Sequence, residues 1–180
     1  TRDWSNFVRF TQVGEDFNPE VGFLSRTAYR GVEANLMRYV RFPSKPWLRQ
    51  SNPHVTYRGF WDFAGFQETN YLHFDTEVEF AGGGRIGPEF NFSKEGIQRP
   101  FVISPGVIIP PGTYNRFTNG WDIGSNPSAK LSAQVRLDLG GFWTGTRWCG
   151  NTTVTWRQSS SFTTAVSLNQ NFVRLPQGKF

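Results

Sequence analysis

Residues 70–80 alternate between two classes of side chain. One set is mostly apolar and comprises Leu72, Phe74, Thr76, Val78 and Phe80; the other is polar and comprises Tyr71, His73, Asp75, Glu77 and Glu79. Successive side chains of a β-strand point to opposite faces of a sheet, so this period of two predicts one amphipathic strand. The polar set is also the densest cluster of titratable groups in the chain.

Similar alternation recurs along the chain. Strands are predicted at residues 32–42, 54–63, 86–92, 115–123, 129–139, 146–156 and 162–172. Turns are predicted at residues 64–69, 82–84, 124–128, 140–141 and 157–161, and the proline-containing residues 103–114 are irregular. We therefore expect a single all-β domain over residues 1–180. It is an antiparallel up-and-down meander of about 9–10 strands that forms a small barrel, a sandwich or an open curved sheet.

The amino-acid composition favours β-strands and argues against a nucleic-acid partner. Aromatic residues make up 17% of the chain, including 7 Trp and 18 Phe, and such rings favour strands and interfaces. The net charge of +5 is mildly basic. Because the basic residues are scattered and no recognition motif accompanies them, we expect no nucleic-acid partner. No apolar run approaches the roughly 20 residues of a membrane-spanning helix.

The single cysteine, Cys149, excludes an internal disulfide and a multi-cysteine metal site. No histidine or acid stands beside it in the sequence to activate the thiol, so we interpret it as structural. The chain begins at Thr1 without a signal peptide. From this start we expect a processed product or an excised piece of a longer protein.

The polar series of residues 70–80 is the first candidate for chemistry. Carboxylates and an imidazole at spacings of two could bind a cation, or form an acid–base pair with a neighbouring strand. Positions strung along one line are too far apart for a single ion without help from another strand. We therefore interpret the series as a solvated polar face. His54, which follows Asn52 and Pro53, is expected to have a turn or surface role.

Two further motifs also favour structural explanations. Residues 82–87 match G-x-G-x-x-G, but a dinucleotide site needs a helix next, and the following residues are typical of a strand. The acids near Asn18 and Pro19 fit a turn better than a calcium loop; they are Glu15, Asp16 and Glu20. We expect no catalytic residue, no cofactor and no metal, and we expect that the protein is not an enzyme.

Aromatic side chains are the better candidates for binding. Tryptophans could stack on sugars, pack in a core, or contact a protein or a membrane surface. Trp143 and Trp148 flank Arg147 close to the Gly140–Gly141 turn and look least like core residues. The predicted partner-binding set is Trp143, Arg147, Trp148, Trp121 and Trp61.

Three blocks carry a family resemblance. They are residues 14–23 (GEDFNPEVGF), 103–114 (ISPGVIIPPGTY) and 173–180 (VRLPQGKF). In order and spacing they resemble the C-terminal domain of unknown function that follows a family-9-like carbohydrate-binding module in large envelope proteins of Gram-negative bacteria. The resemblance covers essentially the whole chain. It implies a β-rich, barrel-like, exported domain of the outer membrane or periplasm, and it supplies no catalytic residues.

The chain is shorter than the β domain of that family and looks like a fragment of it. Such a fragment has two open sheet edges, and unpaired edge groups are not tolerated in lipid. We therefore expect that this piece does not span a membrane. Instead it closes into a small barrel, folds as a sandwich, or rests its edges on a partner.

These observations predict a non-catalytic structural or accessory module of a bacterial envelope or membrane-protein complex, for instance a respiratory or photosynthetic one. It would dock on the periplasmic side through its aromatic surface and sheet edges, with a protein partner and possible contact with the membrane surface. The alternative is a carbohydrate-binding or outer-membrane transport module. Either function places the chain in the periplasm or at the outer membrane.

Overall fold

The chain folds as an all-β structure. A computed structural model describes residues 3–22 and 26–179. Phe23 and Phe180, which close the first and third blocks named above, lie outside the described residues. Within the described part, no helix is long and apolar enough to cross a membrane.

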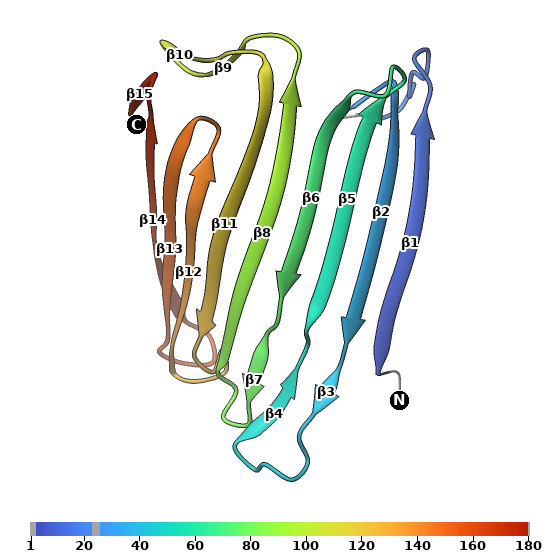
Figure 1. The fold of residues 1–180 in the computed structure, drawn as a ribbon. Helices are drawn as coiled ribbons and strands as arrows, with labels where there is room; N and C mark the ends of the chain where they lie inside the picture. Colours follow the sequence, from blue (N-terminus) through green and yellow to red (C-terminus); the bar gives the residue numbers. More distant parts are fainter. Residues whose placement is uncertain (1–2, 23–25, 180) are drawn as a thin grey trace.

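Long strands build one antiparallel sheet (Figure 1). They are β1 (Trp4–Val13), β2 (Tyr29–Arg38), β5 (His54–Asp62), β6 (Gln67–Asp75), β8 (Arg85–Ile97), β11 (Gly112–Gly124), β12 (Leu131–Phe142), β13 (Gly145–Arg157) and β14 (Thr163–Leu175). Short segments extend or cap this sheet: β3 (Val40–Arg41), β4 (Leu48–Ser51), β7 (Val78–Phe80) and β15 (Gly178–Lys179). A separate hairpin joins β9 (Phe101–Ser104) to β10 (Val107–Ile109).

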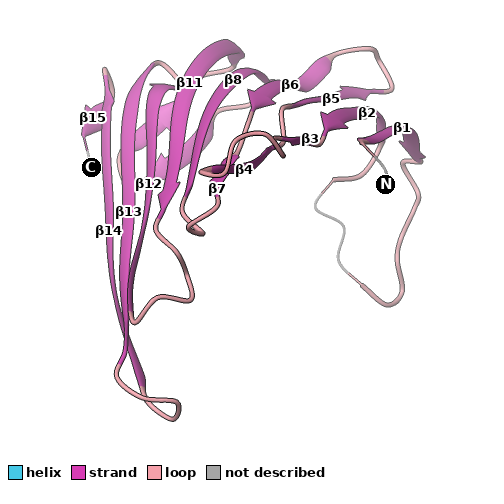
Figure 2. Ribbon diagram, turned by 90° about the horizontal axis from the view of Figure 1, so that it is seen from below, coloured by secondary structure: helices cyan, strands magenta, loops and turns pink. Residues whose placement is uncertain are grey.

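The sheet is an up-and-down meander that does not close. Its strand order is β1-β2-β5-β6-β8-β11-β12-β13-β14-β15, so long strands that follow each other in sequence are neighbours. Viewed along the strands, the sheet forms an arch whose two ends stay apart (Figure 2). The predicted all-β antiparallel meander is confirmed, and of the three arrangements expected the chain adopts the open curved sheet.

The structure differs from the sequence prediction at the ends of two strands, and a proline or a glycine lies at each place. The strand predicted at residues 70–80 is two strands, because β6 leaves β8 at Asp75 and β7 rejoins it at Val78. Pro88 lies in the intervening part of β8 and has no N–H to continue the ladder. The glycines at 140 and 141 do not end their strand, which runs on to Phe142. Gly140 has a φ of 151°, and a Cβ there would overlap the backbone oxygen of Phe117.

Register divides the side chains into two faces. The residues on what we call the apolar face lie on the same side of the sheet in every long strand. Examples are Val8, Ala34, Tyr57, Leu72, Phe92, Phe117, Leu139, Trp148 and Phe172. On the other face, which we call the polar face, carboxylates, amides, hydroxyls and guanidiniums predominate. The same period of two that was visible in residues 70–80 thus continues across the whole sheet.

Among the described residues, compact hydrophobic packing is confined to one corner of the sheet. The buried hydrophobic residues Val107, Ile109, Val173 and Leu175 form a small core where β10 packs against the end of β14. Most large apolar side chains are instead exposed: Val8 is 80% exposed and Val166 is 67% exposed. A folded monomer of this mass exposes about 8,900 Å² by the usual scaling. This sheet exposes 11861 Å².

Candidate functional site: the polar face of the sheet

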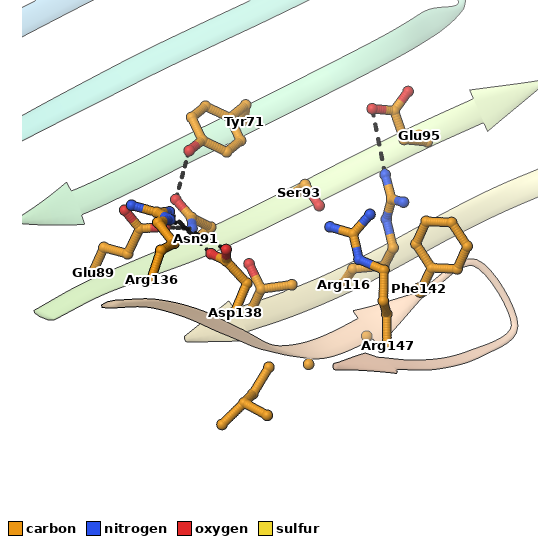
Figure 3. Close-up of a pocket in the computed structure, with 14 residues that line it drawn as sticks. Tyr71, Glu89, Asn91, Ser93, Glu95, Arg116, Arg136, Asp138, Phe142 and Arg147 are labelled. Atoms are coloured by element: carbon orange, nitrogen blue, oxygen red, sulfur yellow. Dashed lines mark hydrogen bonds and ion pairs between the residues drawn. The ribbon is translucent and has the colours of Figure 1, made fainter. Parts of the chain in front are cut away.

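A hollow on the polar face gathers side chains from five successive strands. It has a volume of about 420 Å³ and is lined from β6, β8, β11, β12 and β13. Figure 3 shows these side chains converging from the strands above and below the hollow. Because Tyr71 on β6 and Arg147 on β13 line the same hollow, the polar face is the concave side of the arch.

One end of the hollow is an ion-pair network centred on Arg136. Its guanidinium donates to Glu89 and to both carboxylate oxygens of Asp138, at 2.9 and 3.2 Å for the latter (Figure 3). Glu89 is only 9% exposed. Burying a carboxylate costs free energy unless the group is paired and hydrogen-bonded. The ion pair with Arg136 therefore stabilises the charged form of Glu89 at this buried position.

The other end of the hollow is cationic. Arg116 lies 3.4 Å from Glu95 and its guanidinium stacks 4.9 Å from the Trp143 ring. Arg147 lies 4.8 Å from the ring of Phe142, and Figure 3 shows its side chain close to that of Arg116. Neighbouring guanidiniums over aromatic rings favour anions and polar solutes that carry carboxylate or phosphate groups.

A hydrogen-bond chain runs from the hollow towards β5. Asn91 donates from Nδ2 to Glu89 at 3.2 Å, which orients its carbonyl Oδ1 towards β6. That oxygen accepts from the hydroxyl of Tyr71 at 2.5 Å and lies 2.6 Å from Nδ1 of His73. The side chains of Glu89, Asn91, Tyr71 and His73 therefore form one connected network, which orders them on the polar face.

The two histidines of the chain lie together at the end of this network. The ring centroids of His54 on β5 and His73 on β6 are 5.0 Å apart. Asp75 faces both of them, with an oxygen 2.5 Å from Nδ1 of His54 and another 3.3 Å from Nε2 of His73. The interpretation of His54 as a turn or surface residue is corrected, because register β5–β6 places it directly opposite Asp75 with its side chain 18% exposed.

The rest of the acidic series does not join this cluster. Glu77 pairs with Arg85 at 3.2 Å, and Glu79 accepts a hydrogen bond from Gln50 at 2.7 Å. Both lie beyond the break between β6 and β7, where the chain changes its partner strand. The glycine motif at residues 82–87 leads into strand β8, which already begins at Arg85, so a strand and not a helix continues from the glycines, as the sequence predicts.

The predicted partner-binding residues occupy three places rather than one patch. The register assigns Trp61, Trp121 and Trp148 to the apolar face of three different strands. Trp143 lies in the β12–β13 turn with a φ of 50° and packs on the small core. Arg147 lines the hollow on the polar face. The set does not form one surface, and its role in binding stays a prediction.

Sequence reasoning missed the central residues of the hollow: Glu89, Asn91, Arg116 and Arg136. The two residues on β8 carry a signal, since Glu89, Asn91 and Ser93 alternate with Phe90 and Phe92. A polar series on one strand looks like any solvated face, however. Only the register between strands brings Arg136 to Glu89 across an intervening strand.

Comparison with family models, with curated proteins and with solved structures finds no match to this chain. The resemblance to the envelope β domain therefore stays a prediction. Two of its three blocks nevertheless have clear places in the fold. Residues 103–114 include the capping strand β10, and residues 173–179 include the end of β14 and β15, so the second and third blocks meet in the small core.

Proposed function

We propose that this sheet is a membrane-embedded wall, with its apolar face towards lipid acyl chains and its polar face towards a water-filled passage. This is the outer-membrane transport function among the alternatives, and it replaces the expectation that the chain does not span a membrane, which assumed that both sheet edges stay uncovered. The observation that carries it is the continuous apolar face on the convex side, opposite a concave face of paired charges. A water-soluble sheet that is covered on one side has the reverse arrangement, with its apolar face packed in a core.

The exposure of the apolar side chains supports a nonpolar surrounding. Phe172 is 58% exposed, Leu168 is 58% exposed and Leu131 is 63% exposed, and all belong to the apolar face. Soluble monomers rarely expose contiguous apolar patches beyond a few hundred Å². Burial of this face in acyl chains removes that cost by the hydrophobic effect.

The height of the apolar band also supports this proposal. On β12, apolar side chains run from Leu131 to Leu139 on one face. At about 3.4 Å per residue this run is about 27 Å long, and on a strand tilted by about 40° it spans about 21 Å of the apolar band, which is about 25 Å tall on outer-membrane proteins. Long strands of 9 to 13 residues match the length that crosses a bilayer at a tilt.

Cations on the apolar face lie towards the strand ends, where lipid headgroups would be. They are Arg30, Arg38, Lys94 and Arg174. The Arg38 guanidinium stacks 5.3 Å from the ring of Trp4, the first residue of β1. Tryptophans and basic side chains gather at both surfaces of a bilayer, because their apolar stems reach inwards while their polar ends stay hydrated.

The wall requires further strands at both edges. Among residues 3–22 and 26–179, β1 pairs only with β2, and β14 pairs beyond β13 only with the short β15. Unpaired backbone groups cost several kcal/mol each in hydrocarbon, about the value of an unmade hydrogen bond. In this proposal the two edges are therefore covered by additional strands of the membrane assembly.

Quenching of tryptophan fluorescence by brominated lipids tests this function. Two variants would each keep a single tryptophan, Trp121 on the apolar face or Trp143 in the small core, with phenylalanine at the other tryptophan positions. In vesicles with brominated acyl chains, Trp121 fluorescence is expected to fall strongly and Trp143 fluorescence to change little. Equal, weak quenching of both, with the circular dichroism of a β fold retained, would contradict the proposal.

A further inference from the structure

We infer that His54, His73 and Asp75 form a binding site for a divalent metal ion of the zinc class. The three side chains offer two imidazole nitrogens and a carboxylate oxygen, and these ligand atoms all lie within 4.8 Å of one another. His54 and His73 are the two histidines of the chain. The pairing of two adjacent strands brings them together. The site is independent of what surrounds the apolar face.

The hydrogen bonds around His73 direct its Nε2 towards Asp75, where that nitrogen can hold either a proton or a metal ion. Because Nδ2 of Asn91 donates to Glu89, its Oδ1 is the atom that faces His73 and can only accept. Nδ1 of His73 therefore carries the hydrogen, and in the neutral ring Nε2 carries a lone pair. Nε2 is the atom that lies 3.3 Å from Asp75. In metal-binding histidines, the ring nitrogen that does not bind the metal usually donates its hydrogen to a carbonyl or carboxylate, as Nδ1 of His73 does here.

His54 also offers a ring nitrogen to the proposed metal ion. Its Nδ1 is buried and has no hydrogen-bond partner among the described residues. The carboxylate of Asp75 is 2.5 Å away, but not in the direction of a hydrogen bond. Two ring nitrogens and a carboxylate oxygen thus converge on one point, and a metal ion that replaces any ring proton there would be held by all three.

The ligand set selects the class of metal. Two imidazoles and one carboxylate suit Zn²⁺ and related transition metals, whereas Ca²⁺ and Mg²⁺ prefer a shell of oxygens. Three protein ligands leave a fourth position of a tetrahedral zinc ion for water or a solute on the concave side. Tyr71, whose ring stacks 5.8 Å from that of His73, covers one side of the imidazole.

Calorimetric titration of the full chain in detergent micelles with ZnCl₂ tests this site. All variants carry Cys149→Ser, which removes the thiol as a competing ligand. One Zn²⁺ per chain is expected, with affinity at least tenfold lower in His54→Gln and His73→Gln. Asn91→Leu, which removes only the support, is expected to lose about tenfold. Asp122→Asn on the same face, which pairs with Arg85 2.9 Å away, should bind as before, and CaCl₂ should give no binding heat.

A second measurement needs no change at the site. Because the chain has only two histidines, selective ¹⁵N labelling of histidine gives one set of ring signals for each. One equivalent of Zn²⁺ is expected to shift Nε2 of His73 and Nδ1 of His54 together. The inference is overturned if neither ring responds, or if zinc binds equally well after both histidine substitutions.

Discussion

The thiol of Cys149 donates a hydrogen bond to Oδ1 of Asn171, 3.0 Å away on the neighbouring strand, and so lies on the polar face. The preceding residue, Trp148, packs against Phe172 on the apolar face, with ring centroids 5.2 Å apart. Adjacent residues of β13 and β14 thus report on opposite environments. In the proposed wall, one of these environments is water and the other is lipid.

The single cysteine makes this difference measurable. Cys149 lines a hollow of about 290 Å³ on the polar face, so a charged maleimide is expected to label it in lipid vesicles. In the Cys149→Ser background, a cysteine in place of Val154 on the apolar face should react far more slowly, because the charged reagent does not enter hydrocarbon. Mass spectrometry over time gives both rates, and similar rates would argue against lipid on the apolar face.

An arginine introduced on the apolar face of β12 should lower the free energy of unfolding far more than one introduced on the polar face. Val135→Arg places a cation near the middle of the apolar band and is expected to lower the free energy of unfolding in a bilayer by about 2–4 kcal/mol. Gln134→Arg, one residue away on the polar face, should change it by less than about 0.5 kcal/mol. Urea unfolding in vesicles measures both. Equal effects of the two substitutions would be incompatible with a lipid-facing band.

The pair of Glu89 and Arg136 should be strongly coupled. Arg136→Met leaves the carboxylate of Glu89 without its charged partner and is expected to cost about 2–3 kcal/mol of stability. In Glu89→Gln the remaining amide is neutral, so adding Arg136→Met should cost much less than it does alone. A double-mutant cycle from urea unfolding gives the coupling. Simple additivity would show that the network does not stabilise the sheet.

Gly120 leaves the space that Glu89 occupies. A Cβ at position 120 would overlap the Glu89 side chain, whereas a Cβ at Gly82 has nothing within 4 Å. Gly120→Ala is expected to cost about 1–3 kcal/mol by displacing Glu89 from Arg136, and Gly82→Ala should be neutral within about 1 kcal/mol. Chemical unfolding compares the two. A harmless Gly120→Ala would mean that Glu89 is not held in its observed position.

The alternation of apolar and polar residues made the all-β fold predictable from the sequence, but it did not reveal every strand. β12 follows the predicted pattern closely, because its apolar residues from Leu131 to Leu139 all point to one face. β1 was not predicted, since Phe7 and Val13 occupy its polar face and blur the period of two. The curvature and the open edges depend on twist accumulated over many strands, which no local pattern encodes.

The histidine cluster depends on a detail that the sequence does not reveal. A β-bulge in the β5–β6 hairpin shifts the register between Phe60 and Trp61. Continuing the pairing of Trp61 with Gln67 without that bulge would set His54 opposite Phe74. A slip of one residue moves a side chain to the other face. The bulge therefore decides whether His54 meets Asp75, and the two histidines could not be paired from their spacing.

Spin-label accessibility along β12 tests the membrane-wall proposal most directly. Each position from 131 to 139 is changed in turn to cysteine in the Cys149→Ser background and labelled in lipid vesicles. Collision with oxygen, which concentrates in hydrocarbon, is expected to peak at 131, 133, 135, 137 and 139. Collision with a water-soluble nickel chelate should peak at 132, 134, 136 and 138. High accessibility to nickel at both sets of positions would contradict the proposal.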